Sequence, residues 1–459
     1  MNHSLRLGLN WWSAWQAQSA NRHVLAALVT VGSYTVLGKL LAFLKDAVVA
    51  YQFGTGDALD AFLIALVVPQ FAINLLGGSL NAALIPTYIQ VREQEGQAAA
   101  QRVFSTVTVL TSGFLVILCF ILMLSASSML PLLAAGYSSD KLTLARTLYL
   151  VLLTSIVLSG ISTTWGAVLN AANRFAWAAA VPIVTSVVTI LAVLLLAPYW
   201  NIYTLAGSAI GGALIEAALL GWQLKRLGMS LLPRWYGMTP AARQVLGQYW
   251  PMMAASFLMG SIHIVSQSMA AMLDPGSVSA LSYGNKVTAG LLGIGATAVS
   301  TAFLPHFSRM VAMADWDGIR QTLLTYTGVL LVATIPVTLI LIYWSEPVVA
   351  LLFQRGAFTE ADTKVVGQVQ TMYLLQVPFY LVSMLFVRFV TALRSTYVMV
   401  WGNVLNLAIC IALTYVLMQR FGVVGIALAT STMYLVSCGF LILVSLALLR
   451  IDVNKSAAT

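Results

Sequence analysis

The chain has 459 residues, of which 60% are hydrophobic and only 8% are charged. Soluble proteins carry about 25% charged residues, so this composition excludes a water-exposed exterior and requires lipid around most of the surface. Long apolar runs without period-two alternation predict helices rather than a barrel, because the backbone must satisfy its own hydrogen bonds in lipid. The net charge of +9 comes from basic residues scattered singly over short loops, a pattern typical of membrane proteins and not of a nucleic-acid surface.

The first 23 residues form a segment of their own. Leu5, Leu9, Trp12 and Trp15 recur at spacings of four, three and three, which fits either an interfacial helix or a disordered tail. No charged region leads into a short apolar core, so no cleavable signal peptide is expected.

Apolar runs of roughly 20 residues, the length that crosses a bilayer, predict an all-α polytopic membrane protein of about twelve transmembrane helices. Six helices are expected near 24–52, 58–88, 103–134, 142–172, 176–198 and 203–224, and six more near 247–272, 278–310, 321–353, 362–393, 396–418 and 423–448. The predicted organisation is therefore a segment 1–23, a six-helix half 24–224, a cytoplasmic linker 225–246, a second half 247–448 and a cytoplasmic tail 449–459.

Basic residues between the predicted helices lie mostly on one side. If the N-terminus is inside, fifteen lysines and arginines fall in cytoplasmic loops and tails and five fall on the opposite side. The positive-inside rule then predicts a multi-pass protein of the bacterial inner membrane with both termini in the cytoplasm.

The two halves resemble each other. "AALIPTY" at 82–88 resembles "TAFLPHF" at 301–307, with Pro86 and Pro305 in register, and Arg174 and Arg394 are separated by nearly the same offset. Two pseudo-symmetric halves of six helices each share one orientation in the membrane, which is typical of transporters that work by alternating access.

Ionisable side chains inside the predicted helices are the candidates for a functional site, since each costs about 2.5–3.5 kcal/mol near a helix centre. They are Lys39, Lys45, Asp46, Asp60, Glu216, His263 and Lys286. A lysine ~4 Å from a phosphate gains about 1 kcal/mol in water and about 4 at an effective dielectric of 20. The three lysines are therefore predicted to bind an anionic ligand, a diphosphate.

Each of these residues also has a purely structural interpretation. Lys45 could reach an interface or pair with Asp46 or Asp60. His263 shares a polar stripe with Gln267, and such a stripe lines a cavity or bonds to a neighbouring helix.

Glu216 has two interpretations as well, a proton-coupling carboxylate or a solvated or paired acid near a helix end. Enzyme signatures are absent: the sequence has no Walker A motif, no GxSxG motif and no loop large enough for a catalytic domain. We therefore expect a protein that is not an enzyme and that uses no cofactor and no metal.

Three stretches carry specific motifs: "GKLLAFLKDAVVAYQFGTGDALDAFLIALVVPQ" from Gly38 to Gln70, "SYGNKVTAGLLGIGATAVSTAFLPHFS" at 282–308 and "LFQRGAFTEADT" at 352–363. They resemble the MurJ/MviN family of lipid II flippases, in the MOP exporter superfamily. The resemblance spans nearly the whole chain. It implies an alternating-access fold that moves undecaprenyl-diphosphate-linked saccharides across the inner membrane.

The resemblance also assigns roles. Lys39 and Lys45 stand where the family has arginines in its first helix, and Lys286 matches an arginine of the eighth. Asp46 and Asp60 match the family's acids, which implies charge pairing or gating.

The sequence departs from the family at several places. The family has an arginine and an "A-E-G" motif after the proline that matches Pro69, and this chain has "FAINLLGGSL". The resemblance leads one to expect an acidic residue shortly after Lys286, where this chain has Ala289. The family commonly has fourteen helices, and about twelve are expected in this sequence. The cargo could therefore be lipid II or a related exopolysaccharide or O-antigen unit on the same carrier.

Several functions are compatible with these patterns. The leading hypothesis is a flippase for a lipid-linked oligosaccharide, with membrane lipid around it, no nucleic-acid partner, and glycan-assembly enzymes as candidate partners. A cation-coupled exporter of drugs or amphiphiles would instead depend on Glu216 or Asp60. A non-transporting envelope scaffold would tolerate loss of the lysines, and a glycan polymerase or ligase would need a large external loop.

Overall fold

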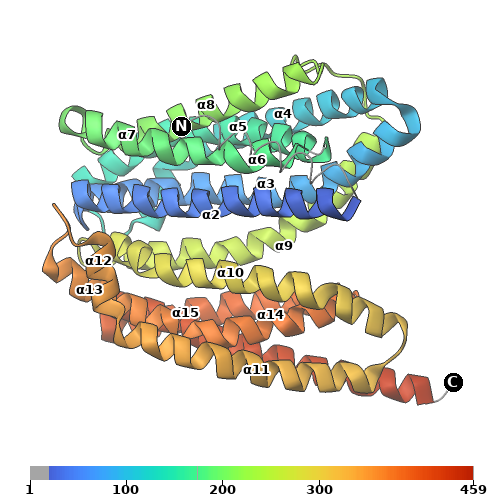
Figure 1. Ribbon diagram of the computed structural model, residues 1–459. Helices are drawn as coiled ribbons and strands as arrows, with labels where there is room; N and C mark the ends of the chain where they lie inside the picture. The colour runs from blue at the N-terminus through green and yellow to red at the C-terminus, as the bar shows by residue number, and fades with distance from the viewer. Residues whose placement is uncertain (1–19, 173, 458–459) are drawn as a thin grey trace, which may run out of the picture. The chain divides into compact units, whose positions relative to one another are not determined.

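The computed structural model describes residues 20–172 and 174–457, and these residues are nearly all helical, with no strand among them (Figure 1). The N-terminal segment with Leu5, Leu9, Trp12 and Trp15 lies outside the described residues. The first group of helices is α2 (Ala20–Phe53), α3 (Asp57–Glu95), α4 (Gln97–Leu133), α5 (Ser139–Ala171), α6 (Phe175–Ala180), α7 (Pro182–Trp200) and α8 (Tyr203–Arg226). The second is α9 (Pro240–Ala270), α10 (Ser277–Ala312), α11 (Trp316–Tyr343), α12 (Ser345–Phe353), α13 (Glu360–Leu374), α14 (Gln376–Ala392) and α15 (Thr396–Ala457).

The membrane-spanning segments agree with the sequence prediction. Within the described ranges, nine helical stretches are long and apolar enough to cross a bilayer. One of these, Tyr397–Arg450, contains two helices that meet at Gly422, and α2 and α9 are also long enough to span. Twelve spanning segments result, six on each side of the non-helical connection 227–239.

Several predicted helices are broken where the backbone cannot continue. Pro182 begins α7 directly after α6, because proline lacks the N–H that an interior helical residue donates. The break at Gly422 instead falls between the predicted helices 396–418 and 423–448, as expected; Gly422 has φ +57° and ψ −138°, a conformation that glycine adopts without the steric cost of a side chain. The predicted helix 321–353 is likewise divided into α11 and α12 at Trp344.

The chain forms two compact units that are interleaved along the sequence. Among the described residues, unit 1 comprises 20–49 with Ala72–Leu124 and Leu150–Met252, and unit 2 comprises Ala50–Phe71, Ser125–Tyr149 and 253–457. The domain boundaries predicted at 224 and 247 stay predictions. Features of the two internal repeats fall at equivalent positions, since Pro86 and Pro305 lie in the second helix of each group.

Unit 1 is held together by close helix packing and by the 227–239 connection. A Cβ on Gly212 of α8 would lie 2.9 Å from Thr185 Cγ2 of α7, so the two helices approach each other closely at this glycine. The Ser105 hydroxyl, on α4, accepts the N–H of Arg234 at 2.6 Å and donates to its carbonyl at 2.9 Å. These two hydrogen bonds hold the 227–239 connection against α4.

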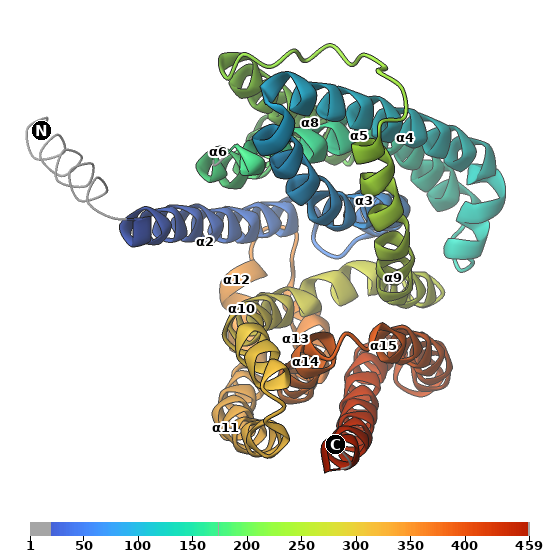
Figure 2. The same ribbon diagram turned by 90° about the vertical axis from the view of Figure 1, so that its right-hand side faces the viewer.

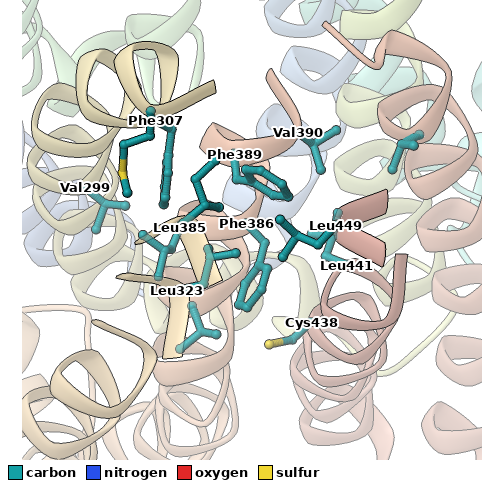
Figure 3. Close-up of a cluster of buried hydrophobic side chains, with 14 residues drawn as sticks. Val299, Phe307, Leu323, Leu385, Phe386, Phe389, Val390, Cys438, Leu441 and Leu449 are labelled. Carbon is teal, nitrogen blue, oxygen red and sulfur yellow. The ribbon is translucent and has the colours of Figure 1, made fainter. Parts of the chain in front are cut away.

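In unit 2, a cluster of buried apolar side chains lies where α10, α11, α14 and α15 pack together (Figures 2 and 3). The rings of Phe307 and Phe389 are fully buried and meet edge to face, with centroids 5.8 Å apart. Phe386 and Leu385 of α14 and Leu441 of α15 complete the contact seen in Figure 3. We call these residues the phenylalanine cluster.

Other apolar side chains point outward. Val332 of α11 is 75% exposed and Leu195 of α7 is 66% exposed, which is expected of helix faces that contact lipid. Tyr199–Trp200 ends α7 and Tyr343–Trp344 ends α11, and all four aromatic side chains are exposed. Aromatic residues at helix ends are enriched at the membrane–water interface, so these pairs indicate where the two helices leave the hydrocarbon.

Replacing Phe389 with alanine should lower the free energy of unfolding by roughly 3 kcal/mol, because it leaves a cavity in the phenylalanine cluster. The measurement is the thermal unfolding transition of the purified protein in detergent. Val332→Ala is the control, since it removes methyl groups from an exposed position. Equal losses in the two variants would contradict the assignment of buried and lipid-facing surfaces.

Candidate functional site

A cavity of about 510 Å³ lies within unit 2, among α9, α10, α13, α14 and both parts of α15. Its wall includes apolar side chains such as Met259, Leu292 and Met399. Its polar side chains are amides, hydroxyls and one imidazole, namely His263, Ser266, Asn285, Tyr373, Gln376, Tyr380, Ser383, Asn403, Asn406, Thr430, Tyr434 and Ser437. No aspartate, glutamate, lysine or arginine is among the lining residues, so the wall combines apolar surface with uncharged amides and hydroxyls and one histidine.

Three residues predicted from the sequence lie at or near this cavity. His263 is on its wall, whereas Gln267, one turn further along α9, is buried and does not line it. The predicted polar stripe is thus divided between a cavity and a packed interface. Lys286 directly follows the lining residue Asn285 on α10 and is not itself a lining residue.

The other predicted cations lie on α2, in unit 1. Lys39 is exposed. Lys45 is half-buried, with its Nζ 3.4 Å from Asp46 Oδ1. The acid beside Lys45 in the sequence is therefore its partner in space.

The side chain of Asp60 is buried against the start of α10. It is 1% exposed, and its two carboxylate oxygens accept the N–H groups of Gly276 and Ser279, each at 2.8 Å. Gly276 is the residue before α10, and its lack of a side chain leaves the start of that helix without a cap of its own. A carboxylate from α3 thus caps α10, satisfying N–H groups that no helical carbonyl can reach and complementing the positive end of the helix dipole.

Asp60 pairs with Lys141, a residue that the sequence placed in an external connection. The Nζ of Lys141 lies 3.3 Å from Asp60 Oδ2 and 2.5 Å from Asp57 Oδ1, and it stands 4.1 Å from the centre of the Tyr137 ring. Asp57 is largely exposed, but the Lys141 side chain is only 11% exposed. One lysine therefore neutralises an exposed and a buried carboxylate together.

Further contacts join the same end of unit 2. The carbonyl of Tyr51 accepts the N–H of Ala357 at 2.8 Å, and the Thr55 hydroxyl bonds to Asp362. A Cβ on Gly276 would lie 2.5 Å from the Thr55 carbonyl oxygen, so this approach depends on glycine. We call the α2–α3, α4–α5 and α9–α10 turns with the α12–α13 loop the closed end of unit 2.

Glu216 lies apart from these groups, on α8 of unit 1. Its Oε2 accepts a bond from the Thr185 hydroxyl at 3.3 Å, next to the close approach of α7 and α8 at Gly212. The described parts of α6 and α7 contain no lysine, arginine or histidine that could neutralise it. Across the described residues, no group of three His, Cys, Asp or Glu side chains is arranged to hold a metal ion.

Sequence reasoning missed Lys141 and the amides of the cavity. Lys141 looked like an ordinary loop cation, although Asp57 and Asp60, three residues apart at a helix start, indicated a need for a nearby positive charge. Asn403 and Asn406 carried no signal, because single amides in apolar helices also occur as helix-packing groups.

The family model described as "Lipid II flippase MurJ" matches residues 49–456. The chain belongs to the MurJ family. It is 28% identical to the probable lipid II flippase MurJ of Synechocystis over 88% of this chain and 78% of that protein. It is 26% identical to the lipid II flippase MurJ of Burkholderia cenocepacia over 76% of this chain and 69% of that protein. The membership agrees with the resemblance found in the sequence.

Solved structures of MurJ and of other MOP transporters share the fold. A structure of lipid II flippase MurJ in an inward closed conformation superposes with a TM-score of 0.77 at 22% identity, covering 92% of each chain. An inward-facing MATE-family multidrug transporter of the MOP superfamily gives 0.75 at 11% identity, covering 93% of this chain and 99% of that one. This MurJ-family chain is therefore a multi-pass protein of the inner membrane with a MOP transporter fold.

Asp60→Asn should loosen the closed end by about tenfold or more, because it replaces charge-assisted bonds and places an amide N–H₂ near backbone N–H groups. The measurement is labelling by a membrane-impermeant maleimide of Val278→Cys, in a variant without the three native cysteines. Val278 is fully buried, so labelling reports opening. Asp57→Asn is the control, since Asp57 contacts Lys141 but is not the acceptor of the α10 N–H groups, and equal labelling in both would contradict the capping role.

Proposed function

We propose that this chain is a flippase that moves an undecaprenyl-diphosphate-linked saccharide across the inner membrane by alternating access. The observation that carries this proposal is the match of the lipid II flippase family to residues 49–456, which covers helices of both groups. The relatives are named lipid II flippases. Such proteins move their substrate without a chemical step, which agrees with the expectation that this chain is not an enzyme.

We assign the diphosphate to Lys39, Lys45 and Lys286. Lys45 lies eight residues before the end of α2 at Phe53, and Lys286 lies nine residues after the start of α10 at Ser277. Both positions are deep enough for partial dehydration, which strengthens a lysine–phosphate attraction several-fold relative to water. In this proposal Asp46 neutralises Lys45 when no substrate is bound, since the pair is already in contact.

The closed end provides the gate in this proposal. Asp60 belongs to the first group of six helices, and α10 belongs to the second. Opening the transporter at this end requires the two to separate, so the bonds from Gly276 and Ser279 to Asp60 must break. Lys141 is in the first group with Asp60 and can remain beside it after α10 has moved away.

The cargo in this proposal is either lipid II or a related exopolysaccharide or O-antigen unit. The diphosphate and polyprenyl tail are common to these substrates, and the lysines address the common part. Ala289 lies on the wall of the cavity at a position where the family resemblance leads one to expect an acid. This difference supports a saccharide other than that of lipid II.

One observation favours a different transport function. Glu216 is a carboxylate within a spanning helix, with Thr185 as its hydrogen-bond donor and no cation on α6 or α7, as a cation-coupled exporter of amphiphiles would need. Drug resistance that depends on Glu216 would support that function, whereas an envelope defect that depends on the lysines supports the flippase. A non-transporting scaffold would tolerate both sets of changes.

We also propose that both termini lie in the cytoplasm and that glycan-assembly enzymes are partners. A fluorescent protein fused to the C-terminus should be bright, and alkaline phosphatase fused at Tyr137, in the α4–α5 turn, should be active, because it folds only outside the cytoplasm. A fusion at Gly96, in the α3–α4 turn, is the matched control and should be inactive. The reverse pattern would invert the topology.

Lys286→Ala should reduce complementation of a flippase-deficient strain by at least tenfold at equal expression, because it removes one of the phosphate-binding charges. Lys286→Arg should restore most of the growth, since it keeps the charge. Lys364→Ala is the control, as Lys364 is exposed and pairs with Glu360 on its own helix. Wild-type growth of both the Lys286→Ala and Lys39→Ala strains would refute the proposed diphosphate site.

A further inference from the structure

The 227–239 connection is bonded to unit 1 at more than one point. Gln101 of α4 donates a hydrogen bond from its Nε2 to the carbonyl of Ser230 at 2.9 Å. One turn further along α4, the hydroxyl of Ser105 makes its two bonds with the backbone of Arg234. These bonds fix the backbone of the connection against α4.

The apolar side chains of the connection divide into an inner and an outer set. Met229 is buried, and the hydroxyl of Tyr88 donates to its Sδ at 3.9 Å. Leu231 packs near Gly221 of α8, where a Cβ would lie 3.2 Å from Leu231 Cδ1. The outer set is exposed and consists of Leu232, Trp235, Tyr236 and Met238. Because the backbone is fixed, the outer side chains are held on the surface of unit 1.

The end of α8 adds an arginine and a tryptophan to this surface. The guanidinium of Arg226 stands over the Trp222 ring, 3.9 Å from its centroid, which is a cation–π contact. The Trp222 ring is 44% exposed and meets Trp177 of α6 edge to face, with centroids 5.7 Å apart. Both groups are therefore held in place and still accessible.

The charge of this stretch has one sign. The sequence contains no aspartate or glutamate between Glu216 and Asp274. The basic residues before α9 and in its first turn are all exposed, and they are Lys225, Arg226, Arg234 and Arg243. A surface with exposed aromatic rings and several arginines, and without acids of its own, is complementary to an anionic one.

This surface lies at the ends of spanning helices. Trp222 and Arg226 are in the last two turns of α8, a helix long and apolar enough to cross the bilayer. Gln101, which holds the connection, is in the first two turns of α4, another such helix. Helix ends lie at the depth of the lipid headgroups, where tryptophan and tyrosine are enriched.

We propose that the outer face of the 227–239 connection, together with the end of α8, binds the headgroups of anionic phospholipids. The residues that form it are Trp222, Arg226, Leu232, Arg234, Trp235 and Tyr236, and we call them the interfacial patch. Its aromatic rings lie among the headgroups, and its guanidinium groups attract the phosphates of anionic lipids. Lipid bound there anchors unit 1 at the membrane surface, whatever cargo the protein moves.

Two other occupants fit the interfacial patch less well. An uncharged lipid surface would accept the aromatic rings but would leave Arg226 and Arg234 without an anionic partner. A soluble protein would have to displace the headgroups at the ends of α4 and α8 before it reached the patch. An anionic phospholipid satisfies both the rings and the arginines at the depth where they lie.

The test measures quenching of a bimane fluorophore on Leu232→Cys, in the full-length protein without its 3 native cysteines. The protein is placed in phosphatidylcholine nanodiscs containing a small fraction of nitroxide-labelled lipid, either phosphatidylglycerol or phosphatidylcholine, with the nitroxide near the headgroup. The ratio of the two quenching constants measures the preference for the anionic lipid. Aqueous iodide, used as a third quencher, measures exposure of the fluorophore to water.

We expect labelled phosphatidylglycerol to quench about fivefold more strongly than labelled phosphatidylcholine, because the arginines enrich the anionic lipid around the patch. The double substitution Arg226→Gln with Arg234→Gln should bring the two quenching constants close to each other. Arg309→Gln with Arg320→Gln is the matched control, since it removes the same charge from two exposed arginines of unit 2. The control should keep the preference.

Equal quenching by the two lipids in the protein with all its arginines would overturn the proposal, as would an equal loss of preference in the control. Quenching by iodide and by neither lipid would also overturn it, in favour of a surface that faces water and binds a soluble partner. Should the double variant not fold, as judged by gel filtration, salt decides the outcome. At about 1 M salt the Debye length is only ~3 Å, so the preference of the unsubstituted protein should be lost, and a preference that persists would contradict the proposal. Nanodiscs carry the lipids in both leaflets, so these outcomes are independent of the proposed topology and of the flippase function.

Discussion

A backbone N–H or C=O group in the hydrocarbon of a bilayer finds no water to bond with, and each such group must be satisfied within the protein. Helices solve this problem along their length but not at their ends, where four N–H and four C=O groups have no helical partner. At the start of α10, a residue from another helix satisfies these groups. Gly276 cannot cap it, and the carboxylate of Asp60, from a distant part of the sequence, does so instead. Lys141 offsets the cost of burying that carboxylate. The start of α10 therefore depends on Asp60, and Asp60 depends on Lys141.

This arrangement connects stability with transport. Contacts made across a sequence separation of more than 200 residues, such as Asp60 with Gly276, join helices from the two groups of six. In the proposed mechanism, these bonds hold the closed end together and break as a set when α10 moves. In the proposed mechanism, the same carboxylate stabilises the closed end and limits how readily it opens.

Charged and uncharged polar side chains lie in different parts of the candidate site. The lysines supply positive charge, which is expensive in a membrane and therefore marks a place where an anion is handled. The cavity of unit 2 is lined by apolar and uncharged polar side chains and carries no acid and no base other than His263. In the proposed function, the lysines bind the diphosphate of the lipid-linked saccharide.

Sequence alone was sufficient for the helices, their number and the transporter family, because the hydrocarbon core requires long apolar runs and tolerates few charges. It also singled out Asp60 and the lysines, since any ionisable residue stands out in such runs. Sequence could not identify the partner of Asp60, because Lys141 and the start of α10 are brought there by packing between helices distant in the chain. Nor could it assemble the cavity, whose amides come from α10, α14 and α15 and look like ordinary packing residues when each helix is considered alone. Local composition thus determined which segments can span the membrane and which polar side chains they carry. Only the tertiary structure decided which of those side chains contact one another.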